Sequence, residues 1–113
     1  LDFEHKPLAT NFVQGCYAAK VDELIARGDI PVPNHIKIDV DGFEPKVIAG
    51  ARATLRDPAV KSLLIETNQN LEDHMAMVAE LNALGFRHEE SQVARAERKS
   101  GTFKGVAEYV FRR

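Results

Sequence analysis

Apolar and ionisable residues alternate along residues 35–41. A period of two residues places each set of side chains on its own face of a β-strand. The apolar residues are also β-branched, which favours a strand over a helix. We therefore predict a buried strand over residues 35–41 with ionisable groups along one face. The apolar set is Ile36, Ile38 and Val40, and the ionisable set is Lys37, Asp39 and Asp41.

A tight turn and a helix are predicted directly after this strand. Gly42 gives the backbone the freedom that a tight turn requires. An acidic residue and a proline are both favourable in the first turn of a helix, and Glu44 and Pro45 occupy those positions. With the apolar stripe that follows, they predict a helix over residues 44–56.

The two aspartates come at the end of the predicted strand, where a role in ligand binding or catalysis is expected. Ligands of open α/β sheets bind beyond the carboxyl ends of the strands, and Asp39 and Asp41 lie at such an end. A structural interpretation is equally open, in which Asp41 caps the following helix and Lys37 holds Asp39 by an ion pair.

Strand and helix patterns continue to alternate along the rest of the chain. This order is typical of parallel βαβ units, whereas two strands joined without a helix must be antiparallel. We therefore predict an α/β fold with four strands, the last of them antiparallel. The further predicted elements are a helix from Val21 that stops at Gly28, a strand over 61–67, a helix over 72–84 with Met75, Val78, Leu81 and Leu84 inward and Met77 on its surface, a weak strand over 86–90, a hairpin loop over 92–104 and a strong strand over 105–111.

Composition limits the classes of partner. The formal net charge is −2, which predicts neither a nucleic-acid surface nor a polybasic membrane anchor. No apolar run approaches the roughly 20 residues of a membrane span. The single cysteine, Cys16, excludes an internal disulfide and is consistent with a reducing compartment, so we expect a cytoplasmic location. The four histidines show no ligand spacing and are expected on the surface.

The central stretch resembles a known family motif. Residues 36–44, Ile-Lys-Ile-Asp-Val-Asp-Gly-Phe-Glu, and residues 47–51, Val-Ile-Ala-Gly-Ala, are similar to the central motif of FkbM-type methyltransferases. The segment Val21-Asp22-Glu23-Leu24 resembles the family's preceding helix, and Leu64-Ile65-Glu66 resembles its next strand. Two places depart from the pattern: Asp41 stands where Glu is commoner, and Ala107-Glu108-Tyr109 stands where an Asn before the aromatic residue is common.

The resemblance implies a fold and a cofactor. It implies the C-terminal half of a doubly wound, Rossmann-like class I sheet, with parallel strands and a terminal antiparallel hairpin in the order 4-5-7-6. It also implies use of S-adenosylmethionine to methylate a hydroxyl of a sugar, lipid or polyketide-type acceptor. No glycine-rich turn follows a strand in residues 1–113. We therefore expect a fragment, a partial methyltransferase domain over 1–113, whose cofactor-binding residues lie upstream of Leu1.

Roles for the site residues follow from the resemblance together with the chemistry of methyl transfer. A hydroxyl acceptor must lose its proton, and a carboxylate at a strand end can take it. The expected catalytic residues are Asp39 first and Asp41 second. Those expected to bind the acceptor, a small molecule or glycan, are Lys37, Glu44, Glu66 and Asn68.

Three alternatives to these roles remain open. Lys37 would face Glu66 in a purely structural ion pair if the two strands are adjacent. Asp39, Asp41, Glu66 and Asn68 are also similar to the oxygen ligands of metal-assisted, catechol-type methyltransferases, although we expect no metal because Lys37 competes for the carboxylates. The third alternative is that the chain is a non-catalytic half-fold that serves as an interaction domain.

Overall fold

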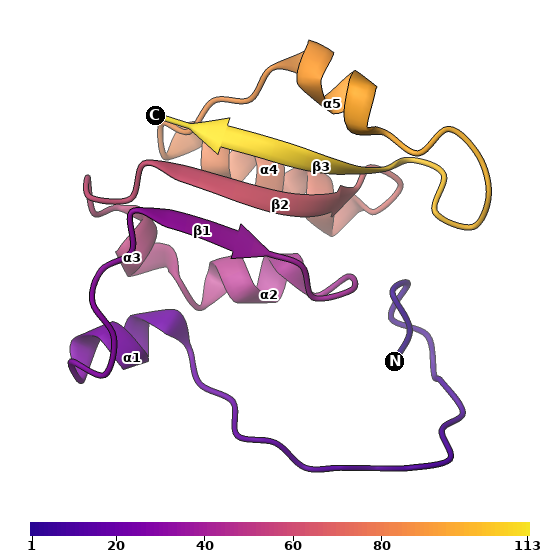
Figure 1. Ribbon diagram of the computed structural model, residues 1–113, viewed down its shortest axis with the longest axis horizontal. Coiled ribbons are helices and arrows are strands. Elements are labelled where there is room, and N and C mark those ends of the chain that lie inside the picture. The colour runs from indigo at the N-terminus through magenta and orange to yellow at the C-terminus, as the bar shows by residue number, and fades with distance from the viewer.

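A three-stranded mixed sheet with helices on one face makes up the body of the protein (Figure 1). The computed structural model describes residues 1–113. Strand β1 (His35–Ile38) pairs in parallel with β2 (Ser62–Asn68), and β3 (Val106–Arg112) pairs antiparallel with β2. The order β1-β2-β3, with a parallel first pair and an antiparallel last strand, confirms the predicted arrangement of these three strands.

The predicted helices are present, but one of them is divided into two, and one further helix is found. The helices are α1 (Val21–Ala26), α2 (Glu44–Ala49), α3 (Arg52–Leu55), α4 (Glu72–Ala83) and α5 (Glu90–Ala96). The predicted helix over 44–56 is divided where α1 attaches. The Asp22 carboxylate of α1 accepts the N–H groups of Ala53 and Thr54 at 3.0 and 2.9 Å, so it caps the start of α3 from outside.

The predicted weak strand over 86–90 is wrong. Only Arg87 pairs with a strand residue, Arg112, in an isolated antiparallel bridge. Residues predicted as a hairpin loop instead form α5, which buries Val93. Because α5 occupies the edge of β3, it replaces the fourth strand along most of that edge.

The core lies between the sheet and the helices, as the alternation predicts. Leu63, Ile65 and Thr67 of β2 are buried on the helix side, and Phe111 of β3 packs with them. The inward face of α4 differs from the prediction, because Met77 is buried and Met75 is exposed. Buried residues of α4 follow the helical spacing i, i+3, i+4, i+7 from His74, and this phase turns Met75 outward.

The two edges of the sheet differ. Several outward-pointing backbone groups of β3 have partners: Gln92 of α5 donates its side-chain N–H to Glu108 O at 2.9 Å and accepts Val110 N–H at 3.1 Å. Arg98 N–H donates to Val106 O at 2.9 Å. No backbone partner covers the outer edge of β1. The side-chain amide of Gln92 thus takes the place of a neighbouring strand.

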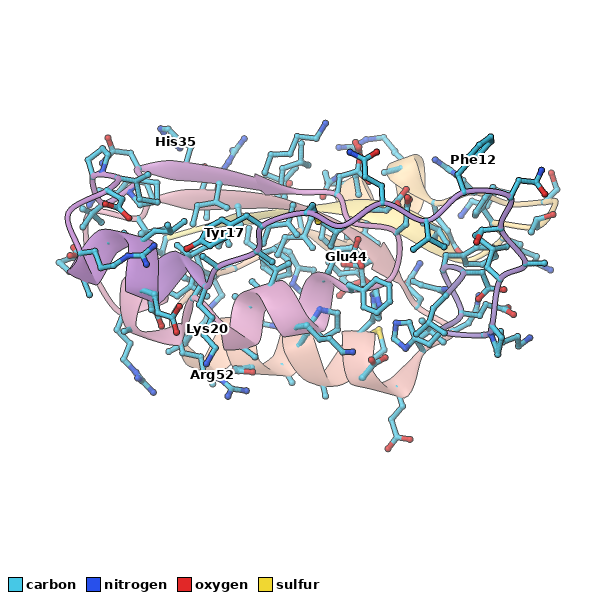
Figure 2. All side chains as sticks on the ribbon, turned by 90° about the horizontal axis from the view of Figure 1, so that it is seen from below. Phe12, Tyr17, Lys20, His35, Glu44 and Arg52 are labelled. Atoms are coloured by element: carbon cyan, nitrogen blue, oxygen red, sulfur yellow. The ribbon has the colours of Figure 1, made fainter.

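Residues 1–20 do not belong to either layer. Figure 2 shows the sheet above α2 and α4 and the N-terminal segment running past them as an extended chain. Phe12 and Tyr17, labelled there, are exposed. No helix has both the length and the apolar character that crossing a membrane requires.

Candidate functional site

A strained turn connects β1 to α2 at the carboxyl end of the sheet. Asp41 has a φ of 51° and Gly42 a φ of 98°, so two successive residues adopt left-handed backbone conformations. A side chain at Gly42 would meet Phe3 O at 2.4 Å, which requires glycine for space as well as for conformation. Asp41 is exposed and does not cap α2, whose N-cap residue is Phe43. The predicted cap is therefore wrong.

Glu44 is the residue around which this turn is built. Its side chain is only 1% exposed and lies between the sheet and the helices (Figure 2). Oε1 accepts the N–H of Val40 and Oε2 that of Gly42, both at 3.0 Å. A buried carboxylate that accepts two backbone N–H groups holds a fixed position. Glu44 thus shapes the loop that carries Asp39 and Asp41, and its predicted role in binding the acceptor stays a prediction.

His74 of α4 stabilises the same turn by two hydrogen bonds. Its Nδ1 accepts the N–H of Asn68 at 3.2 Å, so Nε2 carries the ring proton and donates to Gly42 O, also at 3.2 Å. Glu44 Oε2 lies 3.7 Å from Nε2. The ring is 1% exposed, so the expectation that it lies on the surface is wrong. It joins the ends of β1 and β2 to α4.

Carboxylates converge above this framework. Oxygen atoms of Asp39, Glu44 and Glu66 lie within 4.8 Å of one another. Burial and the negative charge of Asp39 raise the pKa of the Glu66 carboxyl, while the Arg98 guanidinium, 3.4 Å away, opposes that rise. Oxygen donors of this kind suit a hard divalent cation such as Mg²⁺. The arrangement can accept a proton, hold a hydroxyl or, when occupied, coordinate a cation.

Lys37 does not pair with the carboxylates. It lies opposite Leu64 in the parallel register and has no carboxylate within ion-pair distance. The predicted ion pairs with Asp39 and with Glu66 are therefore not formed. Glu66 pairs with Arg98 instead. Arg98 comes from the segment after α5, more than 30 residues further along the chain, and no periodic pattern indicates it.

Aromatic residues from the two ends of the chain close over the turn. The rings of Phe3 and Phe103 lie 4.9 Å apart, and the His5 ring stacks on Phe43 at the same centroid distance. His5 Nε2 also lies 2.5 Å from Gly42 O. A small pocket remains beneath them, lined by Phe3, Asp41, Gly42, Glu44, Glu66, Asn68, His74, Phe103 and Val106.

The predicted site residues thus fall into two groups. Asp41, Glu44, Glu66 and Asn68 line the same pocket, and an oxygen of Asp39 lies within 4.8 Å of oxygens of Glu44 and Glu66. Lys37 lies outside the pocket. Sequence reasoning missed His74 and the aromatic cover. The inward spacing of His74 with Met77, Val78 and Leu81 is a pattern that indicates its burial.

Two comparisons with known proteins give matches. The family profile "Methyltransferase FkbM domain" matches residues 18–88. Among curated proteins, "Hexuronic acid methyltransferase AglP" of Haloferax volcanii is 30% identical over 80 residues, which make up 64% of this chain and 33% of that protein. The aligned region therefore spans about a third of its relative. No solved structure gives a significant match.

Proposed function

Because the chain belongs to the FkbM methyltransferase family, we propose that it is the acceptor-side part of an S-adenosylmethionine-dependent O-methyltransferase. The observation that carries this proposal is the convergence of Asp39, Glu44 and Glu66 at the carboxyl ends of two parallel strands. That is where ligands of open α/β sheets bind. The three strands would be the C-terminal half of a doubly wound, Rossmann-like sheet.

The proposed chemistry assigns each side chain a separate task. S-adenosylmethionine, when bound, supplies an electrophilic methyl group on sulfonium sulfur. The acceptor oxygen forms a bond to that methyl carbon, the sulfur–carbon bond breaks, and the hydroxyl proton passes to a carboxylate. Asp39 is the proposed base because it is exposed at the end of β1, with Asp41 as the second candidate. Glu66 and Asn68 would bind the acceptor, and Glu44 and His74 would keep the loop in place.

A sugar hydroxyl is the acceptor class that we favour. The matched relative is named as a methyltransferase of a hexuronic acid, a sugar that carries a carboxylate. Lys37 is exposed and unpaired two residues before Asp39, on the same side of the strand. Its ammonium group would neutralise a carboxylate on an acceptor held by Asp39. Lipid and polyketide hydroxyls would not need that charge.

The cofactor-binding residues are proposed to lie outside residues 1–113. Two observations support this: the chain spans about a third of its curated relative, and no glycine-rich turn follows β1 or β2. We expect the 113-residue chain alone to bind S-adenosylmethionine weakly or not at all by calorimetric titration. Micromolar affinity would contradict this division of the site.

Asp39→Asn in the complete enzyme tests the proposed function. The substitution keeps the shape of the side chain and removes its charge and basicity. A general base contributes roughly 10²–10⁴-fold, so we expect methylation to fall at least about a hundredfold. The melting temperature and S-adenosylmethionine affinity should remain close to those of the wild type. Asp29→Asn, a surface carboxylate paired with Arg27, is the matched control and should leave the rate unchanged.

Other outcomes separate the alternatives. Near-normal methylation by Asp39→Asn would exclude the base role, and Asp41→Asn would be tested next. Loss of activity on chelation, restored by Mg²⁺, would support the metal-assisted reaction, for which the 4.8 Å grouping of three carboxylates provides ligands. Absence of methylation from the complete protein with any sugar, lipid or polyketide acceptor would favour a non-catalytic interaction domain.

A further inference from the structure

A second polar pocket lies at the other end of the sheet. It is lined by Arg87, His88, Glu89, Gln92, Arg95, Val110 and Arg112, and we call it the arginine pocket. Arg112 pairs with Ser62 at the start of β2, whereas the carboxylates gather beyond the end of that strand. In Figure 1 this region lies where α5 runs beside β3. The pocket is therefore separate from the candidate methyltransferase site.

The guanidinium groups of this pocket have no anionic partners. Arg87, Arg95 and Arg112 are exposed, and none has a carboxylate within ion-pair distance. Arg87 and Arg112 are also directly opposite each other, joined by backbone hydrogen bonds of 2.7 and 2.8 Å. Like charges in that position destabilise a pair of strands. In a protein of net charge −2, this local excess of positive charge is not a consequence of overall composition.

His88 adds an unsatisfied polar atom to the same pocket. Its Nε2 lies 3.0 Å from Glu90 Oε1, so Nε2 carries a proton. Nδ1 is buried and has no hydrogen-bond partner. The ring packs against Tyr109 and Phe111, at centroid distances of 5.1 and 5.4 Å, which limits its reorientation. His88 therefore leaves one ring nitrogen in the lining of the pocket for a ligand to satisfy.

We propose that the arginine pocket binds an oxyanion, either a phosphate or a carboxylate group. Arg87 donates Nη1 to Asn82 O at 2.7 Å, which leaves its other N–H groups free. An anion that binds both Arg87 and Arg112 would offset the like charges of these two opposed residues. Guanidinium forks donate two parallel hydrogen bonds to groups of this geometry, and Arg95 approaches from α5 to complete the site. Gln92 does not participate, because both ends of its amide are bonded to β3.

Titration of the protein with inorganic phosphate at low ionic strength tests this site. We expect saturable NMR shifts in the Nε–Hε signals of Arg95 and Arg112 and in the His88 ring. Arg95→Gln and Arg112→Gln should each weaken phosphate binding by about tenfold, the loss expected for one charge-assisted interaction. Arg27→Gln, which removes an equal charge far from the pocket, should leave the affinity unchanged.

A parallel titration with glucuronate distinguishes the two ligand classes. Binding of phosphate alone assigns the pocket to phosphate groups, and binding of glucuronate alone assigns it to carboxylates. The proposal is overturned if neither anion gives saturable shifts. It is also overturned if Arg95→Gln, on an exposed face of α5 where folding is not at risk, binds as tightly as the wild type.

Discussion

The two ends of the sheet carry charges of opposite sign, and they differ in whether the ionisable side chains have partners inside the protein. At the carboxyl end of β1 and β2, acidic groups crowd together, and the two buried ionisable side chains, Glu44 and His74, have partners inside the protein. At the other end, positive groups crowd together and remain exposed without carboxylate partners. Burial makes the difference, because a buried ionisable group without a partner would unfold the structure, whereas an exposed guanidinium is hydrated.

The acidic end of the sheet is preorganised, whereas the arginine pocket is not. The acidic end is held by hydrogen bonds that exist before any ligand arrives, which favours catalysis. In the arginine pocket, the guanidinium groups of Arg95 and Arg112 have no acceptor inside the protein, and Arg87 uses only Nη1 on the carbonyl of Asn82, which favours binding of an external ligand. The two sites lie at opposite ends of the same sheet, so residues of one can be substituted without touching the other.

Removing His74 should have the largest effect on stability. His74→Ala deletes the acceptor of Asn68 N–H and the donor to Gly42 O, and it leaves a cavity in the core. We expect the free energy of unfolding to fall by about 3 kcal/mol in urea denaturation. His35→Ala, at an exposed histidine of β1, should cost less than about 0.5 kcal/mol. Equal losses in the two variants would show that internal partners do not hold the acidic end.

Arg113 sharpens the comparison at the basic end, because it has the internal partners that Arg112 lacks. Its guanidinium donates to Val60 O and Leu55 O, both at 2.9 Å, and lies 4.2 Å from the centre of the Phe86 ring. We expect Arg113→Ala to lower the free energy of unfolding by about 2 kcal/mol. Arg112→Gln should change it by less than about 0.5 kcal/mol. Thermal melts of both variants measure the difference, and a reversed order would contradict it.

Glu66→Gln is expected to have the smallest effect and the opposite sign. Burial and Asp39 raise the pKa of Glu66 above 4.5 in the folded state, so its ionisation costs stability as the pH rises through that pKa. At neutral pH the variant should be more stable by about 0.5 kcal/mol, despite losing the Arg98 ion pair. The gain should vanish below pH 4.5, where the carboxyl is protonated in both states. A loss at neutral pH would mean that the Arg98 ion pair outweighs the repulsion.

Local patterns predicted the elements of the fold well and the contacts between them poorly. Alternation along residues 35–41 indicated a strand with Ile38 buried, and the βαβ order indicated the parallel pair. The inward turn of His74 was missed because a histidine is usually counted as polar. The pairing of Glu66 with Arg98 depends on where a distant loop folds back, and no local period encodes that. Asp39 and Asp41 were placed at the correct end of the sheet because that position is local to the strand.

The covered edge of β3 determines how copies of this chain could associate. Strand addition needs a row of free backbone groups, and on β3 the amide of Gln92 and the backbone of Arg98 interrupt that row by occupying several of them. The free edge of β1 is the remaining place where a foreign strand can add. When two copies pair through their β1 edges, the combined sheet has only the two β3 edges at its ends, and these resist further strand addition. For residues 1–113 alone, self-association through the free edge of β1 would therefore stop at a pair and would not extend into a fibre.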